Sequence, residues 1–207
     1  DLPAKESRQT RSFIQLGVIV SPNKLNKTCF ELWSELLKQW PIAKLCFFNR
    51  SYKDIGLQKR ISQQILALGA LPDQISFRAP EHHMAWYMGL KDFDLVLDSF
   101  PYGGALSSCD ALWMNVPVLA LTGGRKIAES IFRHIEVLDC LLDDPNQYTQ
   151  RAKFLENAGL YPKDRSLRDQ LLKSPICDHH RHCQELELAF RQAWENWYQT
   201  EVSWLWR

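Results

Sequence analysis

Short apolar runs alternate with longer amphipathic runs through roughly the first two-thirds of the chain, and this alternation constrains the fold more than any other feature. Such a pattern is typical of βαβ units, which assemble into a parallel sheet covered by helices. Buried parallel strands read as continuous apolar runs, and residues 116–121 fit that description. The predicted strands occupy residues 13–20, 44–48, 74–77, 93–98 and 117–121. The predicted helices between them occupy residues 29–39, 57–68, 82–90 and 107–114.

After Gly124 the pattern changes to helices separated by turns. The breaks are predicted at residues 143–145, at Gly159 and at 174–175. The last helix should run from about residue 178 to 198 and is rich in large aromatic side chains. Because such side chains stabilise a fold mainly by burial, we expect this helix to pack on the same domain or on a neighbouring one.

Composition limits the classes of partner. The chain has 207 residues, 45% of them hydrophobic, which suits one sizeable core. Its 25 basic and 24 acidic residues leave a net charge of +1, so we expect no nucleic-acid partner, and any anion site must be local. The longest apolar runs fall far short of the roughly 20 residues that cross a bilayer, so we expect no membrane span.

The cysteines and the first residues bear on location. Six cysteines are scattered without any C-x-x-C pair, which indicates free thiols and a cytoplasmic location. The polar opening, residues 1–11, has neither an initiator methionine nor the order of a secretory signal. We therefore expect the chain to be a segment of a longer protein.

The loop after the fourth predicted strand is the strongest candidate for a binding site. Ligands of open α/β sheets bind beyond the carboxyl ends of the strands. This loop carries Gly103 and Gly104 just before a helix. Glycines let the backbone approach an anion, and a helix N-terminus offers N–H groups and partial positive charge. The loop therefore suits a diphosphate.

Three polar residues at the start of that helix have two interpretations each. Ser107 and Ser108 act either as the N-cap or as donors to a phosphate. Asp110 either complements the helix dipole or accepts hydrogen bonds from ribose hydroxyls.

Three other loops at the same edge of the sheet add candidates. Lys24, after the first strand, is either simply solvated or neutralises a phosphate. His82 and His83, after the third strand, are either exposed without a function or placed for stacking on a base. Arg125 follows a glycine pair after the fifth strand and either binds phosphate or belongs to a solvated basic pair at a turn. The four loops together indicate a nucleotide site more strongly than any one of them.

At these loops the chain resembles a known enzyme family. The main matching segments are DLVLDSFPYGG at 94–104 and CDALWMNVPV at 109–118, supported by residues 22–24, 31–33, 79–80, 174–175 and 185–194. In these segments the chain resembles the O-linked N-acetylglucosamine transferases and the bacterial cytoplasmic protein glycosyltransferases grouped with them. The resemblance spans about residues 13–198.

The resemblance implies an α/β fold, the Rossmann-like C-terminal half of a two-domain GT-B glycosyltransferase, which binds UDP in a cleft against the other half. It implies that Lys24 contacts the diphosphate, that Asp110 holds the ribose and that Ser107 donates to a phosphate. It also places Ala79 at the backbone that contacts uracil. The implied domains are a polar leader or linker at 1–12, a UDP-sugar-binding domain at 13–142 and a helical extension packed on it at 143–207.

The chain also departs from the family pattern. Residues 103–107 lack the histidine and one of the two adjacent hydroxyls that the family's phosphate loop carries. Glu81 stands where the family often has a lysine, and the following segment is about two residues longer, so the resemblance leaves open whether His82 or His83 stacks on the base.

The resemblance predicts transfer of a hexose or N-acetylhexosamine from a UDP-sugar to protein side chains. The expected partners are the UDP-sugar, a protein acceptor and an N-terminal catalytic half that this chain lacks. No cofactor and no metal are expected. The alternative is a degenerate nucleotide-binding fold that serves as an interaction module.

Other chemistries are less well supported. Residues 177–183 have the side-chain types of a metal site, but Asp178 explains the segment as the N-cap of the last helix. The chain has no Walker-type sequence, no recognisable Ser/His/Asp nucleophile set and no Gly-rich dinucleotide fingerprint in the first strand-to-helix turn.

Overall fold

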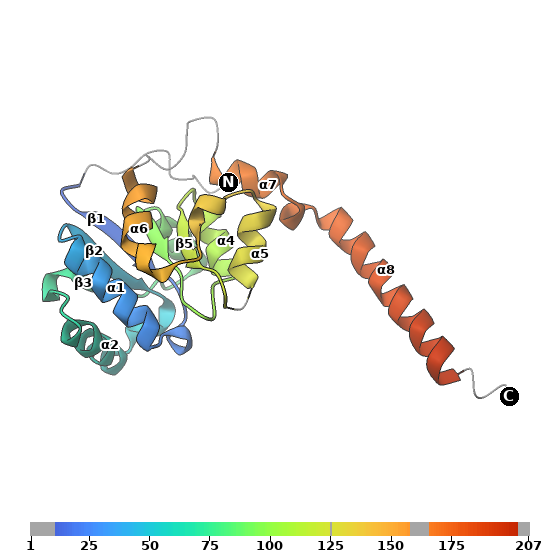
Figure 1. The fold of residues 1–207 in the computed structure, drawn as a ribbon, viewed down its shortest axis with the longest axis horizontal. Coiled ribbons are helices and arrows are strands. Elements are labelled where there is room, and N and C mark those ends of the chain that lie inside the picture. Colours follow the sequence, from blue (N-terminus) through green and yellow to red (C-terminus); the bar gives the residue numbers. More distant parts are fainter. Residues whose placement is uncertain (1–10, 125, 158–165, 203–207) are drawn as a thin grey trace.

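A six-stranded parallel sheet with flanking helices forms the body of the protein. The computed structural model describes residues 11–124, 126–157 and 166–202 (Figure 1). The strand order is β3-β2-β1-β4-β5-β6, and all neighbouring strands are parallel. The strands are β1 Ile14–Val18, β2 Ala43–Phe48, β3 Ile75–Arg78, β4 Leu95–Leu97, β5 Val118–Leu121 and β6 Leu141–Leu142. The predicted Rossmann-like fold class is thus confirmed.

Every predicted strand is present, with ends that differ by no more than two residues. The structure also has one strand that the sequence does not predict, β6, because two residues are too few to show a strand pattern. Most strand residues are buried, which agrees with their continuous apolar sequences.

The helices occupy both faces of the sheet. They are α1 Lys27–Gln39, α2 Ile55–Ala67, α3 His83–Leu90, α4 Leu106–Trp113, α5 Ile127–His134, α6 Tyr148–Asn157, α7 Leu167–Lys173 and α8 His179–Trp197. The strand order reverses between β1 and β4, and crossovers between parallel strands are right-handed, so α1 and α4 lie on opposite faces. In the helical extension, α6 packs on α1, and α7 packs on α4.

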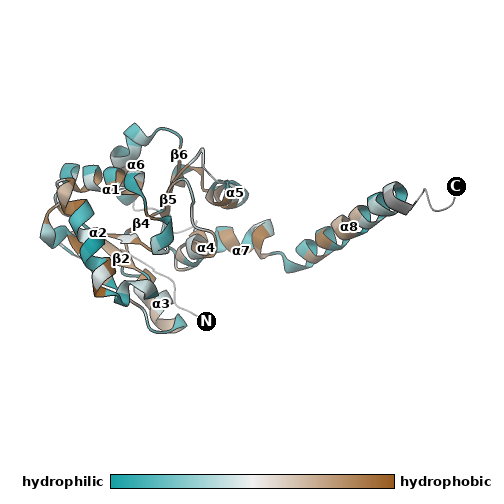
Figure 2. Ribbon diagram, turned by 90° about the horizontal axis from the view of Figure 1, so that it is seen from below, coloured by the Kyte–Doolittle hydropathy of each residue, from teal (hydrophilic) through white to brown (hydrophobic). Residues whose placement is uncertain are grey.

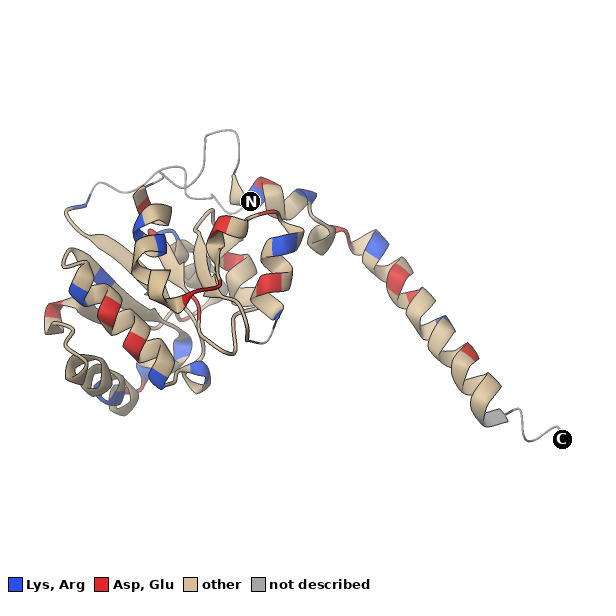
Figure 3. Ribbon diagram, in the orientation of Figure 1, with Lys and Arg blue, Asp and Glu red and all other residues tan. Residues whose placement is uncertain are grey.

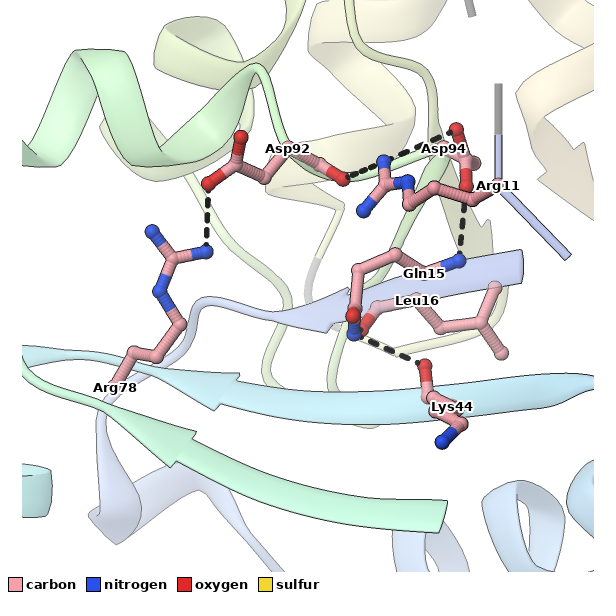
Figure 4. Close-up of polar contacts among 7 residues, drawn as sticks. All are labelled: Arg11, Gln15, Leu16, Lys44, Arg78, Asp92 and Asp94. Carbon is pink, nitrogen blue, oxygen red and sulfur yellow. Dashed lines mark hydrogen bonds and ion pairs between the residues drawn. The ribbon is translucent and has the colours of Figure 1, made fainter. Parts of the chain in front are cut away.

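A polar network at the amino ends of the central strands holds β1 beside β4 (Figure 4). The backbone N–H of Gln15 donates to Asp94 Oδ2 at 2.8 Å, and Arg11 forms an ion pair with Asp94 at 3.7 Å. Arg11 also donates to the carbonyl of Asp92, whose carboxylate pairs with Arg78 at 2.8 Å. Since β1 and β4 are the strands at which the order reverses, this network helps to fix the register of the two strands whose carboxyl ends flank the position where ligands bind in such sheets.

The last helix does not pack on the same domain, which is one of the two predicted positions. Asp178 caps α8 by accepting from the backbone N–H of Arg181 at 3.0 Å, as the sequence indicated. However, α8 extends away from the sheet (Figure 1), and no residue of it is buried by the described part of the chain. The reason lies in the turn at Pro175–Cys177, which separates α8 from α7 and directs it outward.

One side of α8 remains apolar and uncovered by the described residues. Phe190 is 67% exposed and Trp194 is 63% exposed, and the hydropathy colours in Figure 2 show apolar positions between hydrophilic ones along this helix. Basic and acidic residues are interspersed along α8 and around the sheet domain in Figure 3. Across the described residues, no helix is long and apolar enough to cross a membrane.

Candidate nucleotide-binding site

The loops after β1 and β4 meet at the carboxyl edge of the sheet. Lys24 ends a short 3-10 helix, Pro22–Lys24, and its Nζ donates to the carbonyl of Gly103 at 2.8 Å. The side-chain amide of Asn26, which caps α1, donates to the carbonyl of Phe100. The Lys24 ammonium also lies 4.6 Å from the ring centre of Tyr102. In such sheets, ligands bind where the strand order reverses, which here is between β1 and β4. Lys24 lies in the loop after β1 and is therefore at the expected position for a cation that contacts a ligand.

A cleft of about 630 Å³ opens at this edge, between the loops and the helices α3 and α4. The predicted site residues among those lining it are Lys24, His82, His83, Ser107 and Asp110. The structure thus brings residues from three of the four predicted loops to one cleft.

The remaining predicted residues have different positions. Ala79 is not among the cleft-lining residues, although its neighbour Pro80 is. Gly103 and Gly104 are buried and do not line the cleft either. Arg125 lies outside the described residues.

The glycine pair is packed around a buried carboxylate. Asp98 accepts hydrogen bonds from the backbone N–H groups of Ser99 at 2.8 Å and Gly104 at 2.8 and 2.9 Å. A Cβ at Gly103 would lie 2.8 Å from Asp98 Oδ2, and one at Gly104 would lie 2.3 Å from Ser108 Oγ. The approach to Asp98 and Ser108 is therefore enough by itself to require glycine at both positions.

Burial is also the dominant influence on the acidity of Asp98. Desolvation raises the pKa of this carboxyl from its usual value of 3.8 to about 6, against the opposing effects of the Gly104 and Ser99 N–H groups and the Lys24 charge. The packing of the loop around Asp98 thus both requires the two glycines and raises the pKa of the carboxyl.

The N-terminus of α4 differs from the prediction. The N-cap is Ala105, not Ser107 or Ser108, and among the described side chains none caps this helix. Ser107 is half-buried and lines the cleft, whereas Ser108 is buried against Gly104. An N-terminus that has no side-chain cap leaves backbone N–H groups for a ligand.

Asp110 is held by two residues that the sequence interpretation missed. Trp86 Nε1 donates to Oδ2 of Asp110 at 2.9 Å, and the Tyr87 hydroxyl donates to Oδ1 at 3.0 Å. Burial, with a further contribution from the negative charge of Asp110, raises the pKa of the Tyr87 hydroxyl. Trp86 and Tyr87 also line the cleft, but no spacing in the sequence links α3 to α4.

The two histidines are no longer equivalent. His82 is the N-cap of α3, and its Nδ1 accepts from the backbone N–H of Ala85 at 3.2 Å. His83 is the first residue of the helix and is exposed. Arg50, which begins the 3-10 helix Arg50–Lys53 after β2, is a further exposed cation at the cleft that the sequence interpretation did not consider.

The described residues offer no metal centre, since no three of their His, Cys, Asp and Glu side chains are grouped to hold an ion. All six cysteines are free thiols.

Comparison with known proteins places the chain among glycosyltransferases by similarity. No protein-family model matches it. Among curated proteins it is 24% identical over 202 residues to the probable UDP-N-acetylglucosamine–peptide N-acetylglucosaminyltransferase SPINDLY of Petunia hybrida. It is 28% identical over 202 residues to the protein of the same name from Eustoma exaltatum. Each match covers 93% of this chain, which spans about a fifth of the relatives' own length, 21% and 22% respectively.

Solved structures give the same fold. An O-GlcNAc transferase from Thermobaculum terrenum superposes with a TM-score of 0.84 at 23% identity, covering 95% of this chain and 39% of its own. The Anabaena protein HepE in complex with UDP and glucose superposes with a TM-score of 0.58 at 16% identity, covering 85% of this chain and 48% of its own. The predicted resemblance is confirmed: the chain is similar in sequence to O-GlcNAc transferase-like glycosyltransferases and has the fold of the C-terminal half of a GT-B enzyme.

Proposed function

We propose that this chain is the UDP-sugar-binding half of a glycosyltransferase that transfers a hexose or N-acetylhexosamine to protein side chains. The observation that carries the proposal is the cleft at the reversal of strand order, which Lys24 and Asp110 both line. The sequence relatives are named as probable UDP-N-acetylglucosamine–peptide N-acetylglucosaminyltransferases, which supports the same donor and acceptor classes.

Electrostatic stabilisation of the departing diphosphate is the chemistry that this half contributes. An ammonium group has three donors, and Lys24 uses one of them on the carbonyl of Gly103, so others remain for phosphate oxygens. The N-terminus of α4 and the Ser107 hydroxyl add donors beside it. Fixed donors and charges aimed at developing negative charge lower the barrier without a metal, and none is included in the proposal.

The nucleoside lies beside Asp110 in this proposal. Asp110 accepts from the ribose hydroxyls, and the Ala79–Pro80 backbone contacts uracil. One of His82 and His83 stacks on the base, and His83 is favoured because the hydrogen bond to Ala85 holds the His82 ring against the start of α3.

Transfer itself needs a second domain. The described residues form a single sheet domain, and this chain matches only 39% of the T. terrenum enzyme. Of the acidic and histidine residues described at the cleft, Asp110 and His83 are assigned to the nucleotide, His82 caps α3 and Glu81 pairs with Lys53, so none of them is assigned as a general base. We propose that a preceding half supplies the acceptor site, and that the complete protein acts in the cytoplasm without a nucleic-acid partner.

Titration calorimetry with UDP tests the nucleotide site. The chain should bind UDP, and Lys24→Ala should weaken binding by roughly tenfold or more, since a charge-assisted hydrogen bond contributes about 1.5–3 kcal/mol. Lys27→Ala is the matched control, because Lys27 pairs with Glu31 on the exposed side of α1 and does not line the cleft. Equal binding by the wild type and Lys24→Ala, or none by either, would remove the proposed diphosphate site.

A thermal-shift measurement separates the alternative function. If millimolar UDP leaves the melting temperature unchanged and the chain instead associates tightly with another protein, the interaction-module interpretation is favoured. The altered phosphate loop at residues 103–107 and the aromatic last helix motivate this alternative.

A further inference from the structure

The carboxylate of Asp110 is oriented from the protein side by both of its oxygens. Trp86 donates to one oxygen and Tyr87 to the other, at 2.9 and 3.0 Å. An ionised carboxylate has about four lone-pair sites, so each oxygen keeps acceptor capacity for a ligand. The indole N–H can only donate, and burial beside Asp110 keeps the Tyr87 hydroxyl protonated by raising its pKa. Both residues therefore donate to Asp110 and leave its carboxylate to accept from a ligand.

The two donors are themselves held in place. The Trp86 ring stacks on Phe48 at a centroid distance of 5.2 Å and an interplanar angle of 7°. Phe48 is buried at the end of β2, and a Cβ at Gly89 would lie only 2.4 Å from its ring, so α3 sits directly against this side chain. The His82 cap fixes the start of α3. The indole and the hydroxyl consequently reach Asp110 from a rigid support.

We propose that Trp86 and Tyr87 are positioning residues that make the cleft selective for a ribonucleoside diphosphate over its 2′-deoxy counterpart. The inference rests on the proposed function for the class of ligand. A carboxylate held by two donors cannot turn to follow a ligand that lacks a hydroxyl, so the missing hydroxyl leaves an acceptor in the cleft without its partner. A carboxylate free to rotate finds water instead and discriminates less.

This role differs measurably from a purely structural one. If the two donors only joined α3 to α4, their loss would lower stability and weaken binding of both nucleotides alike. If they act through Asp110, their loss changes the ratio of the two affinities, and the change disappears when Asp110 is itself replaced.

Calorimetry with UDP and 2′-deoxy-UDP tests the inference on the wild type, Tyr87→Phe, Trp86→Phe, Asp110→Asn and the double variant Tyr87→Phe/Asp110→Asn. The wild type should prefer UDP by about tenfold or more, as expected when a hydrogen bond to a charged group is lost. Tyr87→Phe and Trp86→Phe should each reduce that preference by roughly threefold to tenfold. In the Asp110→Asn background, Tyr87→Phe should leave the ratio unchanged.

Tyr52→Phe is the matched control. Its buried hydroxyl donates to the carbonyl of Val20 at 3.2 Å and does not contact Asp110, so this variant should keep the wild-type ratio. If Trp86→Phe does not fold, Tyr87→Phe still decides the question because it removes only a hydroxyl.

The outcomes distinguish the two proposals. A wild type that binds UDP and 2′-deoxy-UDP equally, or a Tyr87→Phe variant that keeps the full preference, overturns the positioning role and leaves the nucleotide site intact. A change of the same size in the Asp110→Asn background also overturns it. A wild type that binds neither nucleotide overturns the proposed function, and this inference with it.

Discussion

The buried carboxyl of Asp98 makes the stability of this protein depend on pH in a predictable direction. Its pKa rises from 3.8 to about 6 on folding, chiefly because the site is desolvated. Between these values the folded state binds more protons than the unfolded state, so stability falls as the pH increases. Below about pH 4 both states are protonated, and above about pH 6 both are ionised, so the change is confined to that window.

Replacement of Asp98 by asparagine isolates this contribution. Because one pKa unit corresponds to about 1.4 kcal/mol, the rise from 3.8 to about 6 corresponds to about 3 kcal/mol. The wild type should therefore lose about 3 kcal/mol of unfolding free energy relative to Asp98→Asn between pH 4 and pH 7. The absolute stability of the variant is a separate matter, since an amide both donates and accepts where the carboxylate only accepts.

Urea unfolding followed by circular dichroism at half-unit pH intervals provides the measurement. Asp54→Asn serves as the control, because it removes the same formal charge from an exposed residue and keeps a side chain that can cap α2. Wild-type and Asp98→Asn stabilities that remain parallel from pH 4 to pH 7 would refute the reasoning. A relative gain by the wild type as the pH rises would show that the N–H groups of Ser99 and Gly104 outweigh desolvation.

Three further predictions concern the cleft and the isolated chain. Gly104→Ala should destabilise the protein by about 1–3 kcal/mol in urea unfolding, because the new methyl group overlaps Ser108 Oγ. Adding Ser108→Ala should recover part of this loss, and no recovery would contradict the contact. His82→Ala should lower the free energy of unfolding by about 0.5–2 kcal/mol, because it removes the side chain that accepts from the backbone N–H of Ala85. His83→Ala should instead weaken UDP binding in calorimetry. The reverse result would assign base stacking to His82. The chain alone should release no UDP from a UDP-sugar with an acceptor peptide, whereas joining it to its preceding half should restore turnover; glycosylation by the isolated chain would disprove the half-enzyme proposal.

Local pattern was enough to predict most of the secondary structure. The strands at 44–48 and 117–121 are continuous apolar runs, and such runs are buried wherever a parallel sheet forms. Asp178 was predicted as a cap because the interaction involves only the following turn of its own helix. The location of the cleft was also predictable in outline, since loops after parallel strands share one edge of the sheet.

Capping at the start of α4 shows where local reasoning failed. Ser107 and Ser108 are good capping residues by type, but the helix begins earlier, at Leu106, with Ala105 as its cap. The backbone there follows the bonds of Gly104 to the buried Asp98, so tertiary packing overrides the side-chain preference.

The contacts that shape the site were decided only by the tertiary structure. Lys24 and the carbonyl of Gly103 are 79 residues apart in sequence, and Trp86 and Asp110 are 24 apart. Apolar periodicity reports which face of an element is buried, but it carries no information about which element lies opposite. That depends on the strand order, which brings the loops after β1 and β4 together, and on the packing of α3 against β2, which turns Trp86 and Tyr87 toward Asp110. The sequence by itself determined five of the six strands, most of the helices and the edge of the sheet at which the proposed nucleotide site lies, whereas the orientation of the groups that would hold the nucleotide arose only when distant segments packed together.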